Sequence, residues 1–159
     1  MRQTFAECLL KEAKKNKDIY LLTADLGWGM WNQFRDELPN QFFNIGASEQ
    51  AGIGIAVGLA LKGKIPFVYS ITPFLLWRPA ETIRLYLNHE KIPVNLCGSG
   101  RDKDYKDDGI SHDSTDIREL LRTWPNIHQH WPEDKDTIAG LVEGMIECKS
   151  ADFISLKRG

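Results

Sequence analysis

The sequence predicts an α/β fold of three layers, in which a mostly parallel sheet carries helices on both faces. Short apolar runs alternate with segments of helical periodicity along the whole chain, which is the order that parallel sheets require. The apolar runs are nearly continuous, as in strands that are buried on both faces. Because ligands gather beyond the carboxyl ends of such strands, we expect a binding site at that edge of the sheet.

The N-terminal half alternates three expected helices with three expected strands. Thr4 and Glu7 have the spacing of a capping box, and the helix that they open should end near the basic residues 14–17. The second and third helices are expected at 31–38, closed by Pro39, and at 49–61, followed by a basic last turn and a glycine C-cap. The expected strands are "IYLLTAD" (19–25), "QFFNIG" (41–46) and "IPFVYS" (65–70).

The C-terminal half continues the alternation. A helix is expected over 73–89, and Pro79 should either start it or kink it. The polar segment 101–113 is expected to be a long functional or disordered loop. Ser114 or Thr115 should cap the next helix, at 114–124, and a last helix is expected over 132–149. The remaining expected strands are "IPVNLCGSG" (92–100), "NIHQHW" (126–131) and "DFISLKR" (152–158).

Length, charge and cysteine content exclude several classes of protein. A chain of 159 residues fits one domain, expected over 1–159, and its 20 basic and 22 acidic residues create no field for nucleic acid or a membrane surface. The sequence predicts neither a signal peptide nor a membrane span, so we expect a cytoplasmic protein. Cys8, Cys97 and Cys148 form no CxxC pair, which favours buried free thiols in a reducing compartment.

The glycines in the helix expected over 49–61 do not form a dinucleotide fingerprint. Gly52, Gly54 and Gly58 are spaced GxGxxxG and lie inside the helix. Glycine in a helix interior costs about 1 kcal/mol, so close packing and burial on most sides are expected. Glu49 opens this helix, and two interpretations remain open from the residues alone. It is either a favourable charge on the helix dipole or a carboxyl group that exchanges a proton with a ligand.

Several segments together resemble one enzyme family. They are "TADLG" (23–27), "FFNIGASEQAGIGIAVGLALKGKIPFVYS" (42–70), "FLLWRPAETIR" (74–84), "DDGISHD" (107–113) and "FISLKRG" (153–159). In this order they resemble the pyrimidine-binding domain of transketolase and its thiamine diphosphate relatives, which include deoxyxylulose-phosphate synthase and the beta subunits of 2-oxoacid dehydrogenases. The resemblance covers essentially the whole chain, and the Glu-Gln pair that opens a Gly/Ala helix is its most specific part.

The resemblance implies roles for particular residues. Glu49 would bond the ring nitrogen of the aminopyrimidine of thiamine diphosphate and so promote removal of the proton from the thiazolium carbon. Phe74 matches the aromatic residue that packs on the pyrimidine, and Trp77 a second aromatic of that wall, although both also fit an ordinary helix-to-sheet core. Asp25 and Leu26 match cofactor contacts at a strand end, with a turn cap as the alternative for Asp25.

The "DGISH" element resembles the transketolase "DGPTH" element, which implies that Asp108 and His112 face the sugar substrate. Arg78 and Arg84 are candidates for a substrate phosphate, although helical arginines are usually solvated and Arg78 does not match the family's phosphate-binding arginine cleanly. The pair His128 and His130 lies on one face of a strand without a third ligand nearby in sequence, so no metal site is expected.

The chain departs from the family in lacking the magnesium- and diphosphate-binding domain, with its Gly-Asp-Gly and Asn, and the usual C-terminal domain. The resemblance therefore implies the pyrimidine-binding subunit of a split transketolase that transfers a two-carbon ketol unit and binds thiamine diphosphate together with a separately encoded partner subunit. Magnesium would be held mainly by that partner, and the assembly would be a homodimer or a heterotetramer. The alternatives are a split 2-oxoacid decarboxylase or dehydrogenase, and a non-catalytic regulatory homologue.

Overall fold

The computed structural model describes residues 1–158. Its strands are β1 (Ile19–Thr23), β2 (Phe42–Asn44), β3 (Ile65–Ile71), β4 (Asn95–Ser99), β5 (Ile127–His130) and β6 (Ala151–Leu156). Its α-helices are α1 (Arg2–Lys15), α2 (Asn32–Glu37), α3 (Glu49–Leu61), α4 (Thr72–Trp77), α5 (Ala80–Thr82), α6 (Ile117–Arg122) and α7 (Ile138–Glu147). A π-helical segment covers Ile83–His89, and short 3-10 turns cover Pro39–Gln41, Lys106–Asp108, Ile110–His112 and Lys135–Thr137.

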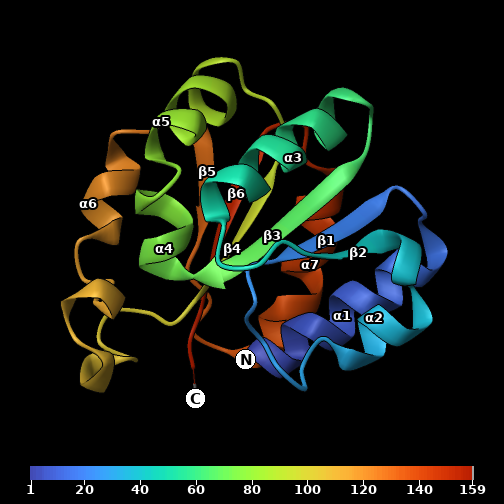
Figure 1. Ribbon diagram of the computed structural model, residues 1–159, viewed down its shortest axis with the longest axis horizontal. Coiled ribbons are helices and arrows are strands. Elements are labelled where there is room, and N and C mark those ends of the chain that lie inside the picture. Colours follow the sequence, from blue (N-terminus) through green and yellow to red (C-terminus); the bar gives the residue numbers. More distant parts are fainter. Residues whose placement is uncertain (159) are drawn as a thin grey trace.

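The strands form one parallel sheet in the order β2-β1-β3-β4-β6-β5 (Figure 1). Helices α1, α2 and α7 cover one face, where Phe5, Phe34 and Val142 belong to one core. Helices α3, α4 and α6 cover the other face, where Ile53, Leu75 and Leu121 belong to a second core. The predicted three-layer α/β architecture is therefore confirmed. None of the helices described here combines the length and apolar character needed to cross a bilayer.

Two features of the helices differ from the sequence predictions at their starts. Helix α1 begins at Arg2 after Met1, without a side-chain cap, so the capping box at Thr4 and Glu7 is not formed. Helix α6 begins at Ile117, and neither Ser114 nor Thr115 caps it. The Asp113 carboxylate instead accepts hydrogen bonds from the Thr115 amide, at 2.9 Å, and from its hydroxyl, at 2.6 Å. The Thr115 hydroxyl is therefore engaged with Asp113 in a carboxylate turn that precedes the helix.

Pro79 kinks the helix expected over 73–89. Helix α4 ends at Trp77, α5 begins at Ala80, and the chain then continues in the π-helical segment. Proline has no amide hydrogen and its ring crowds the preceding turn, so a regular helix cannot run through it. Arg78 falls at this break and its side chain is 43% exposed.

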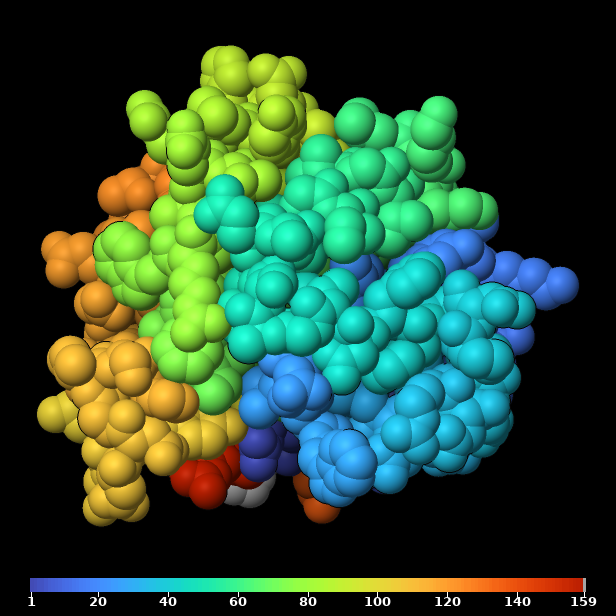
Figure 2. Space-filling view, in the orientation of Figure 1, coloured from blue at the N-terminus to red at the C-terminus, as the bar shows by residue number. Residues whose placement is uncertain are grey.

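Helix α3 is half-exposed, so the prediction that it is buried on most sides is wrong for this chain. A Cβ at Gly52 would collide with the Ile45 side chain, which explains that glycine within the fold. A Cβ at Gly54 or Gly58 would have no heavy atom within 4 Å, and Ile55 beside them is 48% exposed. The teal to green surface of α3 lies open in Figure 2. No contact among residues 1–158 explains why positions 54 and 58 are glycine.

The order of the strands changes direction between β1 and β3, and such a switch opens a crevice at the carboxyl edge of a parallel sheet. Thr23 ends β1 and Ser70 lies at the penultimate position of β3, and both side chains are buried. The segment that leads into α3 follows β2 at the same edge. The sheet therefore brings three strand ends and the first turn of α3 together.

We predict that Gly98→Ala destabilises the fold by about 1–3 kcal/mol because of overpacking. The added Cβ would lie 2.5 Å from Thr72 Oγ1 and 2.9 Å from the Phe153 ring. Gly140→Ala is the matched control, since its Cβ would have no heavy atom within 4 Å on the exposed side of α7 and should stabilise the helix by about 0.5–1 kcal/mol. Urea unfolding of both variants measures the difference. Equal stabilities would contradict the close packing inferred at the end of β4.

Candidate functional site

Glu49 is a buried carboxylate at the first residue of α3, with 2% of its surface exposed. The Ser70 hydroxyl, from the end of β3, donates a hydrogen bond to Glu49 Oε1 at 2.8 Å. Arg78 Nη1, from the break between α4 and α5, donates to Glu49 Oε2 at 2.6 Å and forms an ion pair with it. Each carboxylate oxygen therefore has one partner, and each partner comes from a different element.

The surroundings of Glu49 act on its pKa in opposite directions. Burial, the largest influence, favours the neutral acid and raises the pKa of this carboxyl. The hydrogen bonds from Arg78 and Ser70, a bond to its own amide and the charge of Arg78 together outweigh burial. The pKa of Glu49 is therefore lowered from its ordinary value, and the group is a carboxylate at neutral pH. A buried anion of this kind is a strong hydrogen-bond acceptor.

Phe74 and His112 extend this constellation away from Glu49. The Arg78 guanidinium lies 3.8 Å from the centroid of the Phe74 ring, which is a cation–π contact. The rings of Phe74 and His112 meet edge to face at 4.8 Å between centroids. The Ser111 hydroxyl lies 3.0 Å from His112 Nδ1. A continuous chain of contacts thus joins the buried carboxylate to the imidazole of the 101–113 segment.

A surface pocket of about 550 Å³ lies beside these residues. Phe74, Trp77 and Arg78 from α4 and the break after it line this pocket, together with Ile110 and Asp113 from the 101–113 segment. Trp77 is 48% exposed and Ile110 is 89% exposed, so large apolar groups stand at the mouth of this pocket without a neighbour to cover them. Such exposure of apolar side chains around a concave surface marks a site for a ligand or another protein.

Asp25 and Leu26 lie in a second, smaller pocket of about 120 Å³ at the end of β1. The Asp25 amide donates to Asn44 Oδ1 at 3.1 Å, and Asn44 Nδ2 donates to Asp25 Oδ1 at 3.0 Å. The Thr23 hydroxyl donates to the Leu26 carbonyl at 2.7 Å. These bonds hold Asp25 in a left-handed conformation, with φ of 52°, which aspartate tolerates better than most residues.

The structure brings together some of the residues singled out from the sequence and separates others. Glu49, Arg78, Phe74 and His112 form one connected set, and Trp77 lines the pocket next to it. Asp25 and Leu26 line the separate pocket described above. Asp108 is exposed in a 3-10 turn, on the same segment as His112.

Sequence reasoning did not single out two residues that order the site, Ser70 and Asn44. Each lies at or next to the carboxyl end of its strand, at the edge where ligands gather in parallel sheets. A polar residue at the end of an apolar strand was therefore the available signal. The ion pair between Arg78 and Glu49 joins residues 29 positions apart, and no sequence pattern indicates it.

Comparison with known proteins connects this geometry to a family. The family described as "Transketolase, pyrimidine binding domain" matches residues 1–158. A putative transketolase C-terminal section of Methanocaldococcus jannaschii is 31% identical over 99% of this chain and 50% of its own length. One of the subunits of the apulose-4-phosphate transketolase of Phocaeicola vulgatus is 30% identical over 99% of this chain and 51% of its own length.

Solved structures agree with the sequence relatives. A structure described as a split gene transketolase, inactive beta4 tetramer, has a TM-score of 0.87 and 28% identity, and the match covers 99% of this chain and 51% of that one. A transketolase of Campylobacter jejuni has a TM-score of 0.88 at 19% identity over 99% of this chain and 25% of its own, which supports the fold. This chain spans about half the length of the curated relatives named above. The chain belongs to the transketolase pyrimidine-binding domain family.

Proposed function

We propose that this chain is the pyrimidine-binding subunit of a split transketolase and that it completes a thiamine diphosphate site only with a separately encoded, diphosphate-binding partner. The observation that carries the proposal is Glu49, a carboxylate with 2% of its surface exposed at the first turn of α3. Burying a charge is costly, and a fold retains one where it has a use. The chain also matches split transketolase subunits over 99% of its length.

The residues around Glu49 fit the aminopyrimidine of thiamine diphosphate. Each carboxylate oxygen has a second lone pair in addition to the one that its present partner uses, so Glu49 can still accept a hydrogen bond from a protonated ring nitrogen. The half-buried Phe74 offers an aromatic face one helical turn before Arg78. When bound, thiamine diphosphate would supply a nucleophilic carbon for chemistry at the carbonyl group of a ketose. Glu49 would hold the ring proton, and Phe74 would orient the ring.

Arg78 keeps Glu49 charged while the pyrimidine site is open. Its ion pair and hydrogen bond counteract the burial of the carboxylate and lower the pKa of Glu49. We propose that Arg78 acts on Glu49 in this way, and that a role in binding a substrate phosphate would require the ion pair to open. Trp77, Asp25 and Leu26 would contact the cofactor from the two pockets described above.

His112 and Asp108 would face the sugar. The imidazole of His112 is half-buried against Phe74, while Asp108 is exposed to solvent on the same segment. His112 would therefore hold or move a proton next to the reacting carbonyl group, and Asp108 would bind a hydroxyl group farther out. Both roles follow from their place on the 101–113 segment, which also lines the larger pocket.

The open face of α3 is the proposed contact with the partner. Gly54, Ile55 and Gly58 form an apolar strip without side-chain obstruction, which allows another backbone to approach closely. Phe43 and Leu61 nearby are 43% and 67% exposed. The related split gene transketolase is described as an inactive tetramer of its beta chains. By analogy, we propose that the present chain alone forms a homodimer or larger homomer and becomes active as a heterotetramer.

The diphosphate and magnesium would be held mainly by the partner. Within residues 1–158, one cluster of three possible metal ligands is found, away from Glu49. It consists of His128 on β5, Cys148 on the segment before β6 and Asp152 on β6. We also propose that residues 1–159 act as a single domain in the cytoplasm, which agrees with the free cysteines and the small net charge. Sugar phosphates are the proposed substrates, and 2-oxoacids are the alternative to be assayed beside them.

Glu49→Gln should lower turnover of the reconstituted enzyme at least about 100-fold, because the amide cannot take part in proton exchange. Circular dichroism and partner association should remain as in the original chain. Glu143→Gln, on the exposed side of α7, is the matched control and should retain full activity. Turnover is measured with ketose phosphate donors and, separately, with 2-oxoacids. Activity of Glu49→Gln within a few-fold of the control would exclude Glu49 from the mechanism.

Arg78→Met should raise the pKa of Glu49, because burial is then opposed only by the hydrogen bonds from Ser70 and from the Glu49 amide. The variant should lose about 1–2 kcal/mol of stability at pH 7. The original pair stabilises the fold above the unfolded pKa of glutamate, about 4.3, and this contribution disappears as the pH falls through the folded pKa. The difference between the two proteins should therefore be full at pH 7. It should begin to shrink as the pH falls through the raised pKa of Glu49 in the variant, and continue to shrink below about pH 4.3 as the contribution of the original pair is lost.

Carboxyl-carbon NMR titration and urea unfolding at several pH values measure these two effects. Arg84→Met, an exposed arginine on the neighbouring segment, is the control and should change neither quantity. A pKa of Glu49 that stays low in Arg78→Met would show that Arg78 does not set it.

Gly58→Ala should make the isolated chain more stable, by about 0.5–1 kcal/mol, because alanine is a better helix former. The same change should weaken association with the partner at least tenfold if the partner's backbone packs on α3. Gly140→Ala on α7 carries the same helix benefit and should leave association unchanged. Analytical ultracentrifugation of mixed subunits measures association. Unaltered binding by the double variant Gly54→Ala, Gly58→Ala would place the interface elsewhere.

A further inference from the structure

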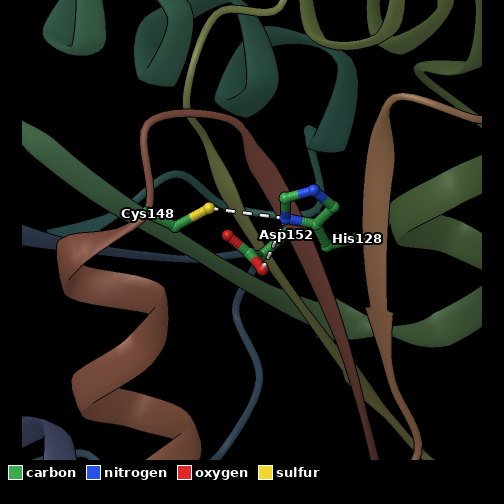
Figure 3. A group of neighbouring side chains, drawn as sticks. All are labelled: His128, Cys148 and Asp152. Atoms are coloured by element: carbon green, nitrogen blue, oxygen red, sulfur yellow. Dashed lines mark hydrogen bonds and ion pairs between the residues drawn. The ribbon is translucent and has the colours of Figure 1, made fainter.

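A group of possible metal ligands lies away from the proposed cofactor site. His128 is the second residue of β5, Asp152 is the second residue of β6, and Cys148 follows the last residue of α7. Figure 3 shows the three side chains pointing toward one another. One ligand atom from each side chain lies within 4.8 Å of the others. Because the two strands are parallel and paired in this register, the group lies at the amino edge of the sheet, opposite Glu49.

Two of the three distances in this group are close to those between ligands of a tetrahedral zinc ion, and the third pair of ligand atoms lies within 4.8 Å. His128 Nδ1 lies 3.4 Å from Cys148 Sγ and 3.7 Å from Asp152 Oδ1. Around zinc, with bonds of about 2.0–2.3 Å, neighbouring nitrogen, sulfur and oxygen ligands are about 3.4–3.6 Å apart. Small rotations of the three side chains would therefore suffice to close the site around an ion.

Asp152 provides an independent indication of a missing partner. Its side chain is only 3% exposed, and Oδ2 is buried without a hydrogen-bond partner among the described residues. His130 Nε2 donates to the other oxygen, Oδ1, at 2.6 Å. A buried carboxylate with one unpaired oxygen costs free energy, and buried charges are normally paired or bound to a metal. The histidine that holds Oδ1 corresponds to the outer-shell partner that commonly orients a metal-bound carboxylate.

Charge and access also fit a divalent ion. A thiolate from Cys148 and the carboxylate of Asp152 would together cancel the two charges of zinc. His128 is 57% exposed, and Cys148 lines a surface pocket of about 220 Å³. An ion can enter from solvent, and water can take the fourth position, as in zinc sites with three protein ligands. Lys64 and Lys149 line the same pocket. Asp18 pairs with the Lys64 ammonium group at 2.6 Å, and Lys149 is exposed to solvent.

We propose that His128, Cys148 and Asp152 bind one zinc ion per chain, with His130 holding the Asp152 carboxylate in place. The sequence alone predicted no metal site, because the two histidines have no third ligand near them along the chain. Pairing of β5 with β6 supplies Asp152, and the end of α7 supplies Cys148. The proposal does not depend on the cofactor site, since the two groups lie at opposite edges of the sheet.

The test is titration of the untagged, reduced, metal-free chain with Co²⁺ and then with Zn²⁺. We expect one equivalent to bind, a thiolate-to-cobalt absorption band that zinc abolishes, and a higher unfolding temperature with zinc. Cys148→Ala and His128→Gln should each weaken binding at least tenfold, and Cys148→Ala should lose the band. Neither side chain is fully buried, so both variants should fold as judged by circular dichroism. His130→Gln should weaken binding roughly 10–100-fold.

Cys8→Ala and His89→Gln are the matched controls, because the same residue types lie on α1 and on the π-helical segment, outside the cluster. Both should bind zinc as the original chain does. No retained zinc in the original chain after gel filtration would overturn the proposal. Equal retention by Cys148→Ala and by Cys8→Ala would overturn it as well, and would assign the metal to other groups.

Discussion

The interaction on which the site depends is the burial of the Glu49 carboxylate between Ser70 and Arg78. A charge with 2% exposure at a helix start requires donors within hydrogen-bond distance. Ser70 meets this need because β3 ends beside the first turn of α3, and Arg78 meets it because Pro79 breaks the following helix there. The charged state of Glu49 therefore depends on where β3 ends and on where Pro79 breaks the helix. The half-buried Phe74 and His112 are placed by the same arrangement.

The exposed half of α3 supports the proposal that Glu49 lies beside a surface that contacts another protein. Gly54 and Gly58 each carry the conformational cost of glycine in a helix, and no neighbour among residues 1–158 needs the space. Trp77 and Ile110 stand exposed beside the pocket next to Arg78. Apolar surface around a buried charge is costly in an isolated protein and useful in a complex. These features support the proposal that the chain forms one side of a shared site.

The sequence was sufficient to predict the architecture because the central strands β1, β3 and β4 are largely apolar runs that alternate with segments of helical pattern. It was less informative about helix starts, since Thr115 bonds Asp113 in a turn and α6 begins at Ile117 without a side-chain cap. Family resemblance indicated Glu49, whereas its partners arise from contacts across 21 and 29 residues. Asp152 and Cys148 are likewise distant from His128 in the sequence, so the sequence argument about His128 did not identify them as further ligands. Periodicity reports which face a residue occupies, but not which strand lies beside it.

The central claim is that this chain supplies half of a thiamine diphosphate site. The most direct measurement is calorimetric titration of thiamine diphosphate with magnesium into the chain alone and into an equimolar mixture with a separately encoded diphosphate-binding subunit. We predict no measurable binding to the chain alone and stoichiometric, tight binding to the mixture. Tight binding to the chain alone, or no binding to a mixture in which the two subunits demonstrably associate, would contradict this claim.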